Sequence, residues 1–216
     1  MPRRDEQEFE ERRQQIISGA LVVFSQKGFE ESTIKDIAQS AGIGSPGLIY
    51  HYFRDKSDLL RQVLETNSPG LQLIASSDRL KDRPLHEVLD RVGRAFLAAF
   101  SDHEGIALFR VMLGEALRRP MVAEMLNDLG PMPTFAFMTE YLGTQMDAGV
   151  LRRTDPGAAI RCFIGPLLAY TLTREIFPLP DTQTLTPERM LAVTVETFLR
   201  GMDYRYPDAA QEGGSA

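Results

Sequence analysis

Apolar side chains recur with helical spacing along almost the whole chain, and no segment shows the strict alternation of a half-buried β-strand. The first clear stripe is Ile16, Ala20, Val23 and Phe24, which fall on one face of a helix. Gly28 follows this stripe and is the usual residue for a left-handed C-terminal cap, so the helix is expected to end there. The pattern predicts an all-α protein.

Residues 32–53 are predicted to form two short helices joined by a glycine-marked turn. Thr33, with Asp36 three residues later, has the spacing of a capping box and predicts the start of the first of these helices. Gly42 and Gly44 are expected to end it. The buried side of this helix is predicted from its apolar positions: Ile34, Ile37, Ala38 and Ala41.

The second short helix is expected to open at Ser45-Pro46. Serine can cap free backbone N–H groups, and proline suits a first helical position because its missing N–H is not needed there. An aromatic and basic cluster follows, from Tyr50 to Lys56. Two short helices arranged in this way form a helix-turn-helix, which places its second helix in the major groove of DNA.

Further helices follow. Asp55 or Ser57 is expected to cap a helix whose apolar face begins at Leu59, and a boundary or kink is expected at residues 67–70. Beyond this point the predicted helices are 84–101, 104–119, 121–129, 134–148, 156–177 and 187–204. The expected organisation is a small DNA-binding domain at 1–62, a larger helical domain at 63–206 and a disordered polar tail at 207–216.

Charge and composition narrow the function classes. The chain has 216 residues and a net charge of −6, which argues against a general nucleic-acid coat. Residues 1–62 hold nine basic and ten acidic residues, so DNA binding needs a local cationic face, which Lys35, Arg54 and Lys56 are placed to supply. No apolar run is long enough to span a bilayer. With Cys162 as its single cysteine, the chain is expected to be cytoplasmic.

The sequence offers no signature of an enzyme. No Ser-His-Asp set, metal-ligand cluster or phosphate-binding loop emerges, so neither a cofactor nor a metal is expected. Gly42-Ile43-Gly44 lacks the strand context of a nucleotide-binding fingerprint. Besides an enzyme, the other alternative to a DNA-binding regulator is a helical adaptor that binds a protein partner. The negative net charge of the chain favours the adaptor, and the cationic cluster disfavours it.

At this point the chain resembles the TetR/AcrR family of bacterial transcriptional regulators. The resemblance covers roughly residues 10–62, and the rest of the chain matches in length and helix count. It is carried by four runs in order: Thr33-Ile34-Lys35-Asp36-Ile37-Ala38, Ala41-Gly42-Ile43, Leu48-Ile49-Tyr50-His51-Tyr52-Phe53 and Lys56-Ser57-Asp58-Leu59-Leu60.

The resemblance implies a set of DNA contacts. Thr33 and Lys35 would approach the DNA from the first short helix. Tyr50 and Tyr52 would donate phenolic hydroxyls to phosphates, and Lys56 would hold a phosphate. The groove-facing side of the second helix would carry the base contacts: Ser45, Pro46, Gly47 and His51.

Some of these residues have a simpler interpretation. Tyr50, Tyr52 and Phe53 could close the small N-terminal core, and Lys56 could be an ordinary solvated lysine. One departure bears on the base contacts: seven residues separate Gly42 from Tyr50, whereas the common family pattern has six. The register of the contacts between Ser45 and Gly47 depends on this longer turn.

The resemblance also implies an effector pocket in the larger domain. Aromatic and methionine side chains at helical spacing are first of all core residues, but methionine-rich surfaces adapt to varied apolar ligands. A largely apolar or aromatic small molecule is therefore expected, because charged residues are scarce on the inner faces. The residues chosen for the pocket are Phe109, Met112, Met138, Tyr141 and Phe163.

A homodimer is expected through two C-terminal helices, Pro156–Phe177 and Pro187–Tyr204, which resemble the pair that forms the four-helix interface in this family. Small residues on the first helix, such as Gly165 and Ala169, allow close approach. A single helix-turn-helix reads few base pairs, so it needs a symmetric partner. The expected protein is a repressor that leaves a palindromic operator when its effector binds. The alternative is an adaptor or activator without small-molecule induction.

Overall fold

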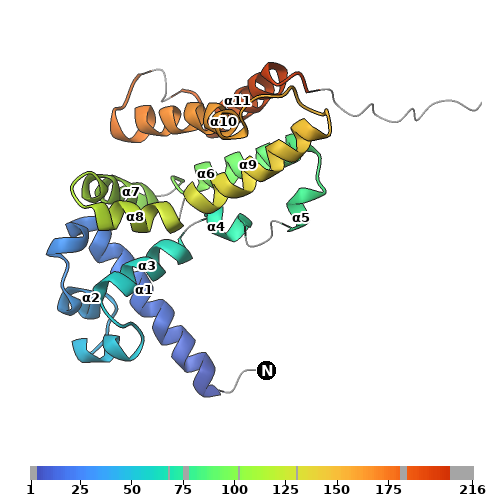
Figure 1. Ribbon diagram of the computed structural model, residues 1–216. Helices are drawn as coiled ribbons and strands as arrows, with labels where there is room; N and C mark the ends of the chain where they lie inside the picture. Colours follow the sequence, from blue (N-terminus) through green and yellow to red (C-terminus); the bar gives the residue numbers. More distant parts are fainter. Residues whose placement is uncertain are drawn as a thin grey trace, which may run out of the picture. The chain divides into compact units, whose positions relative to one another are not determined.

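The computed structural model describes residues 4–67, 69–74, 78–101, 103–129, 131–180 and 184–204. Every regular element in these ranges is a helix (Figure 1). The chain forms two compact units, one of residues Met1–Gln72 and Ala98–Pro133, the other of Leu73–Leu97 and Thr134–Ala216. The domain boundary predicted at residue 62 remains a prediction. The two compact units are separated at other positions of the chain. The predicted tail at 207–216 lies outside the described residues.

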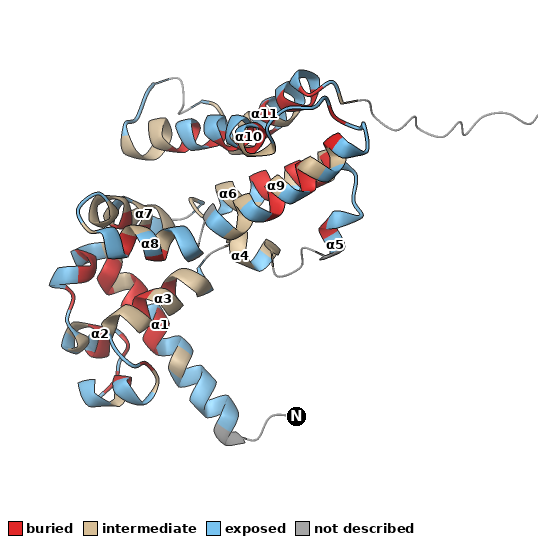
Figure 2. Cartoon of the chain, viewed as in Figure 1, coloured by how far each residue is buried: buried red, intermediate tan, exposed pale blue. Residues whose placement is uncertain are grey.

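The first unit is built around α1 (Arg4–Glu31). Its N-terminal part is exposed, and its apolar stripe begins at Ile16, which is fully buried (Figure 2). Gly28 has a φ of 79° and a ψ of 178°, which kinks the helix three residues before its end. The predicted stop at Gly28 is therefore a kink, because only glycine adopts this backbone conformation without strain.

The helix-turn-helix consists of α2 (Ile34–Ser40) and η1 (Pro46–His51), and α3 (Lys56–Thr66) follows it. Gly42, with a φ of 65°, forms the turn after α2. The second helix is a 3-10 helix with Pro46 in its first turn, and the Ser45 side chain makes no capping bond to it. Asp55 is the cap of α3, because its carboxylate accepts the Asp58 N–H at 2.8 Å.

Helices α7 (His103–Ala116) and α8 (Pro120–Leu129) complete the core of the first unit. Leu108 and Met112 of α7 and Val122 and Met125 of α8 are buried in the same apolar cluster as residues of α1, α2, η1 and α3. Arg119, between these helices, bridges Glu30 of α1 at 2.7 Å. The DNA-binding helices thus share their core with α7 and α8.

In the described part of the second unit there are four long helices: α6 (Leu85–Ala98, all but its last residue), α9 (Pro131–Asp147, from Thr134), α10 (Pro156–Thr171) and α11 (Pro187–Gly201). It also contains three short segments: the last two residues of α4 (Pro69–Ile74), α5 (Asp78–Lys81) and η2 (Leu172–Ile176). Its core joins α6, α9, α10 and α11 around Met138, Phe163 and Leu167. A T-shaped pair of Phe163 and Phe198, with ring centroids 5.5 Å apart, links α10 to α11.

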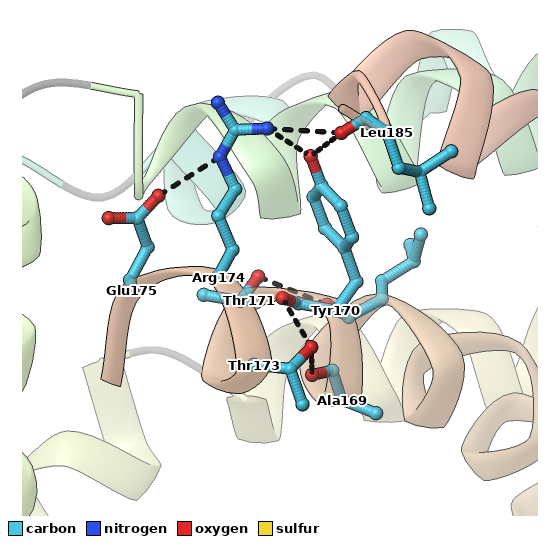
Figure 3. Close-up of polar contacts among 8 residues, drawn as sticks. Ala169, Tyr170, Thr171, Thr173, Arg174, Glu175 and Leu185 are labelled. Carbon is cyan, nitrogen blue, oxygen red and sulfur yellow. Dashed lines mark hydrogen bonds and ion pairs between the residues drawn. The ribbon is translucent and has the colours of Figure 1, made fainter. Parts of the chain in front are cut away.

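Helix α10 continues into η2, a π-helical turn that the sequence did not predict. Figure 3 shows the polar network at this junction. The Arg174 guanidinium donates to the Tyr170 hydroxyl at 2.7 Å and to the Leu185 carbonyl at 3.1 Å, and it pairs with Glu175 at 3.2 Å. Tyr170 also donates to the Leu185 carbonyl at 2.8 Å. The network therefore ties the residues just before α11 to the end of α10.

Most predicted helix positions are confirmed, and their ends are corrected. The helix predicted at 134–148 begins at Pro131, because proline fits a first helical turn. The helix predicted at 156–177 is an α-helix only as far as Thr171. No helix in the described part of the chain is long and apolar enough to cross a membrane.

Candidate nucleic-acid interface

A buried apolar scaffold holds the helix-turn-helix. Ile37 and Ala38 of α2 and Ile49 of η1 are each at most 1% exposed. Gly19 of α1 lies against α2, since a Cβ at this position would stand 2.7 Å from the Ala41 backbone nitrogen. The scaffold leaves the opposite faces of α2 and η1 exposed to solvent.

The N-terminus of α2 has the predicted capping box. The Thr33 hydroxyl accepts the Asp36 N–H at 3.0 Å, and the Asp36 carboxylate accepts the Thr33 N–H at 3.1 Å. Lys27 of α1 pairs with Asp36 at 2.9 Å. The hydrogen bond from Lys27, followed by those from Thr33, lowers the pKa of Asp36 to about 2. The capping box therefore forms the N-terminus of α2, and through Lys27 it also ties α2 to α1.

Seven of the nine predicted DNA contacts are exposed on α2, on η1 or at the cap just before each helix: Thr33, Lys35, Ser45, Pro46, Gly47, Tyr50 and His51. Tyr50 is 58% exposed, which is unusual for a large aromatic side chain. The interpretation of Tyr50 as a core residue is wrong, whereas Phe53, at 3% exposed, is a core residue as expected. The exposed face is formed by short polar side chains, one phenol, one imidazole and one ammonium.

Tyr52 is half-buried because it packs on Phe9, a residue that the sequence analysis did not single out. The two ring centroids are 4.6 Å apart. The early part of α1 also supports the helix-turn-helix through Arg13, which lies over the Phe53 ring and donates to Gln62. Phe9 lies two helical turns before Ile16, on the same face of α1, but only charged and polar residues separate the two in the sequence, so the apolar stripe is clear only from Ile16 onward.

Lys56 has partners other than the predicted phosphate. Its ammonium donates to three backbone carbonyls, those of Phe29 at 2.6 Å, Ser32 at 3.0 Å and Glu30 at 3.2 Å. It also lies over the Phe29 ring, 4.5 Å from the centroid. An ammonium has three hydrogens to donate, so a phosphate would compete with these bonds. The interpretation of Lys56 as an ordinary solvated lysine is wrong.

Two protein-family models match the chain, one over the DNA-binding helices and one over most of the remaining residues. The model described as "Bacterial regulatory proteins, tetR family" matches residues 16–63, which contain the helix-turn-helix. The model described as "AefR-like transcriptional repressor, C-terminal domain" matches residues 87–203, more than half of the chain. The chain belongs to the TetR family. It is a ligand-responsive, DNA-binding transcriptional regulator and not an enzyme.

Individual TetR-family proteins agree with this assignment. The HTH-type transcriptional repressor Rv1474c of Mycobacterium tuberculosis is 28% identical over 179 residues, which cover 81% of this chain and 87% of the relative. The regulator HbdR of Aromatoleum sp. is 51% identical over 61 residues, 26% of each chain. The crystal structure of Bacillus subtilis FadR in complex with stearoyl-CoA shares the fold, with a TM-score of 0.70 and 19% identity over 87% of this chain and 98% of that one.

The five predicted pocket residues of this TetR-family chain fall into both compact units. Phe109 and Met112 lie in the first unit, where Met112 is 2% exposed and belongs to the core beneath the helix-turn-helix. Met138, Tyr141 and Phe163 share the core of the second unit. The Tyr141 hydroxyl donates to the Arg83 carbonyl at 2.8 Å, and burial, with a smaller contribution from Tyr204, raises its pKa to about 12.

Proposed function

We propose that this TetR-family regulator is a homodimeric repressor that binds a palindromic operator and releases it when a largely apolar effector binds. The observation that carries the DNA-binding part is the exposed face of α2 and η1. Exposed Tyr50 and Lys35 stand on a helix pair whose opposite side is buried. As a consequence of DNA binding, we also propose that the protein acts in the cytoplasm.

The proposed DNA contacts divide by chemistry. Lys35, Tyr50 and Tyr52 offer an ammonium and two phenols, which suit phosphates and position the protein on the backbone. Base edges would be read from η1 and its cap, by Ser45, Pro46, Gly47 and His51, and Thr33 would approach the DNA at the start of α2. Because η1 begins with a proline and has six residues, few side chains reach the groove from one protomer. A second copy is therefore needed for a specific site.

The proposed dimer interface uses α10 and α11. Exposed apolar residues on these helices support it, with Leu168 38% and Val193 42% exposed. Gly165 and Ala169, also exposed, would allow a partner helix to approach closely. Other residues of these two helices pack inside their own chain and are not available to a partner: Ala159, Leu191, Thr194 and Phe198.

The proposed effector is a small molecule of largely apolar or aromatic character. The second unit's core around Met138 and Phe163 supports this class, because its side chains are apolar and methionine adapts to ligand shape. The stearoyl-CoA in the FadR crystal structure supports an acyl chain as one form that such an effector can take. Micromolar binding of a charged, strongly hydrophilic effector in preference to apolar molecules would contradict the proposal.

Effector and operator are expected to bind with reciprocal coupling. If the effector weakens operator binding by a given factor, the operator weakens effector binding by the same factor. Titrating a candidate effector into the operator complex tests this, with release expected as the effector saturates. A complex that persists at saturating effector would favour the alternative, a regulator without small-molecule induction.

The DNA contacts are tested by Tyr50→Phe and Lys35→Met. Each variant is expected to bind operator DNA several-fold more weakly, since a hydrogen bond or ion pair to phosphate is worth about 1 kcal/mol or more. The melting temperature should barely change, because both side chains are exposed. Unchanged operator affinity in both variants would contradict the proposed contacts of Tyr50 and Lys35 with DNA.

A further inference from the structure

The end of α1, with the residue that follows it, and the start of α3 meet at one side chain. Residues 29–32 follow the Gly28 kink and precede α2, whereas Lys56 is the first residue of α3, just after η1. The helix-turn-helix lies between these two positions in the sequence. The Lys56 ammonium therefore joins the two ends of the helix-turn-helix, 24 residues apart between Ser32 and Lys56.

The Lys56 ammonium fits its surroundings as a structural ligand. The last carbonyls of a helix lack intrahelical partners and carry partial negative charge, which a cation stabilises. Here the carbonyls of Phe29, Glu30 and Ser32 converge on Nζ at 2.6–3.2 Å, and the Phe29 ring faces the same charge. Phe29 is itself 5% exposed, so it fixes the place of the ammonium.

Neighbouring bonds make the carbonyl-bearing loop rigid. The Ser32 hydroxyl donates to the Gly28 carbonyl, and Ser32 is 2% exposed. Thr33, the next residue, is tied to Asp36 by the capping box. At the other end, Asp55 caps α3 and the Arg54 N–H donates to Asp58 at 2.9 Å. Lys56 is the link between these two ordered segments.

We infer that Lys56 is a positioning residue for DNA binding: its ammonium fastens the end of α1 to the start of α3 and thereby sets the place of η1. This inference rests on the proposed DNA-binding face. It assigns Lys56 no contact with phosphate. Operator affinity then depends on Lys56 through the geometry of the helix-turn-helix and not through its charge at the DNA.

The test compares Lys56→Met with the matched variant Lys35→Met in the full chain. The probe is a DNA duplex that the wild-type protein recovers from a random pool. Lys56→Met is expected to bind it about tenfold more weakly, as for one lost hydrogen bond of a charged group. The slope of log affinity against log salt should stay at the wild-type value. Lys35→Met should reduce the magnitude of that slope by about 1.8, because each of the two protomers loses one phosphate contact worth about 0.9.

Two readouts without DNA complete the test. In Lys56→Met, amide hydrogen exchange across residues 29–37 should become faster and the melting temperature should fall, whereas Lys35→Met should leave both unchanged. Wild-type exchange in Lys56→Met, with a salt slope smaller by about 1.8 for the two protomers, would overturn the inference. Hydrogen exchange is measured without DNA. If the wild-type protein recovers no duplex from the pool, the proposed function is refuted, but the exchange comparison still shows whether Lys56 holds residues 29–37 in place.

Lys56→Arg keeps the charge and covers the case in which Lys56→Met does not fold. A planar guanidinium directs its N–H groups in a fixed fork, unlike an ammonium bonded to three converging carbonyls. Lys56→Arg should therefore show faster exchange across residues 29–37 and weaker DNA binding. Wild-type exchange together with wild-type affinity in Lys56→Arg would overturn the inference, because only the charge would then matter.

Discussion

At the residue scale, several identities in the DNA-binding end follow from space and hydrogen bonding. Gly19 lies where α1 comes close to the end of α2. The Asp36 carboxylate accepts hydrogen bonds from the Thr33 N–H and the Thr33 hydroxyl and pairs with the Lys27 ammonium. The capping box was predictable from sequence because Thr33 and Asp36 are three residues apart. The partners of Lys27, Lys56 and Phe9 were not, because each lies in a different element from the residue that it contacts.

Gly19→Ala is expected to lower the free energy of unfolding by about 1–3 kcal/mol, the usual cost of overpacking. A Cβ at residue 19 would stand 2.7 Å from both the Cβ and the backbone nitrogen of Ala41, and the backbone cannot move aside cheaply. Urea unfolding measures the effect. Gly44→Ala is the control, since a Cβ there meets nothing within 4 Å. Equal stability of the two variants would contradict this account of the α1–α2 contact.

Asp36 predicts a pH dependence of the capping box. Its pKa is lowered from 3.8 to about 2, so its contribution to stability is complete above pH 3.8 and is lost as the pH falls through about 2. A carboxyl titration followed by NMR should give a midpoint near 2. Lys27→Met should move this midpoint upward, because the Lys27 hydrogen bond is the largest cause. A wild-type midpoint at 3.8 would show that the box is not formed in solution.

At the element scale, helical periodicity predicted where most helices lie, whereas local geometry decided their type. Pro46 at the first position of η1 suits a 3-10 helix and an α-helix alike, so the sequence did not distinguish the two types, and the structure has a 3-10 helix there. The π-helical turn η2 depends on contacts between Arg174, Tyr170 and Leu185, which periodicity cannot register. Gly28 carried a clear signal for a break, and its positive φ confirms that the chain turns there.

Arg174→Met is expected to loosen the junction of α10 and the loop before α11. The variant loses hydrogen bonds from a charged group to Tyr170 and Leu185, worth about 1–3 kcal/mol in the free energy of unfolding. Thermal unfolding measures the loss. Arg200→Met is the matched control, because Arg200 forms an exposed pair with Glu196 on α11, of a kind that contributes little. Similar losses in the two variants would refute a special role for the Arg174 network.

At the scale of the whole molecule, sequence motifs identified the DNA-binding end because its short helices follow one another closely along the chain. The effector site was harder to predict. Phe109 and Met112 belong to the first compact unit, although they were grouped with three residues of the second. Aromatic and methionine residues occur in every helical core, so their spacing does not distinguish a core from a pocket. Helices α7 and α8 also join the core of the DNA-binding helices, which no motif indicated.

Val193→Glu is expected to convert the proposed dimer into a monomer and to weaken operator binding strongly. Val193 is 42% exposed on α11, and a buried carboxylate without a partner is costly at an interface. Light scattering at micromolar concentration measures the mass. Leu117→Glu is the control, because Leu117 is 82% exposed in the first unit, outside α10 and α11. A wild-type chain that is monomeric under these conditions would refute the proposed dimer.

The central claim is that the exposed face of α2 and η1 reads DNA as part of a symmetric dimer. Selection of bound duplexes from a random DNA pool by the purified full-length protein tests it most directly. We expect an enriched palindrome with two inverted half-sites, and loss of that enrichment when Tyr50 and Lys35 are both replaced by alanine. Enrichment of no sequence, or the same enrichment by the doubly substituted protein, would contradict it.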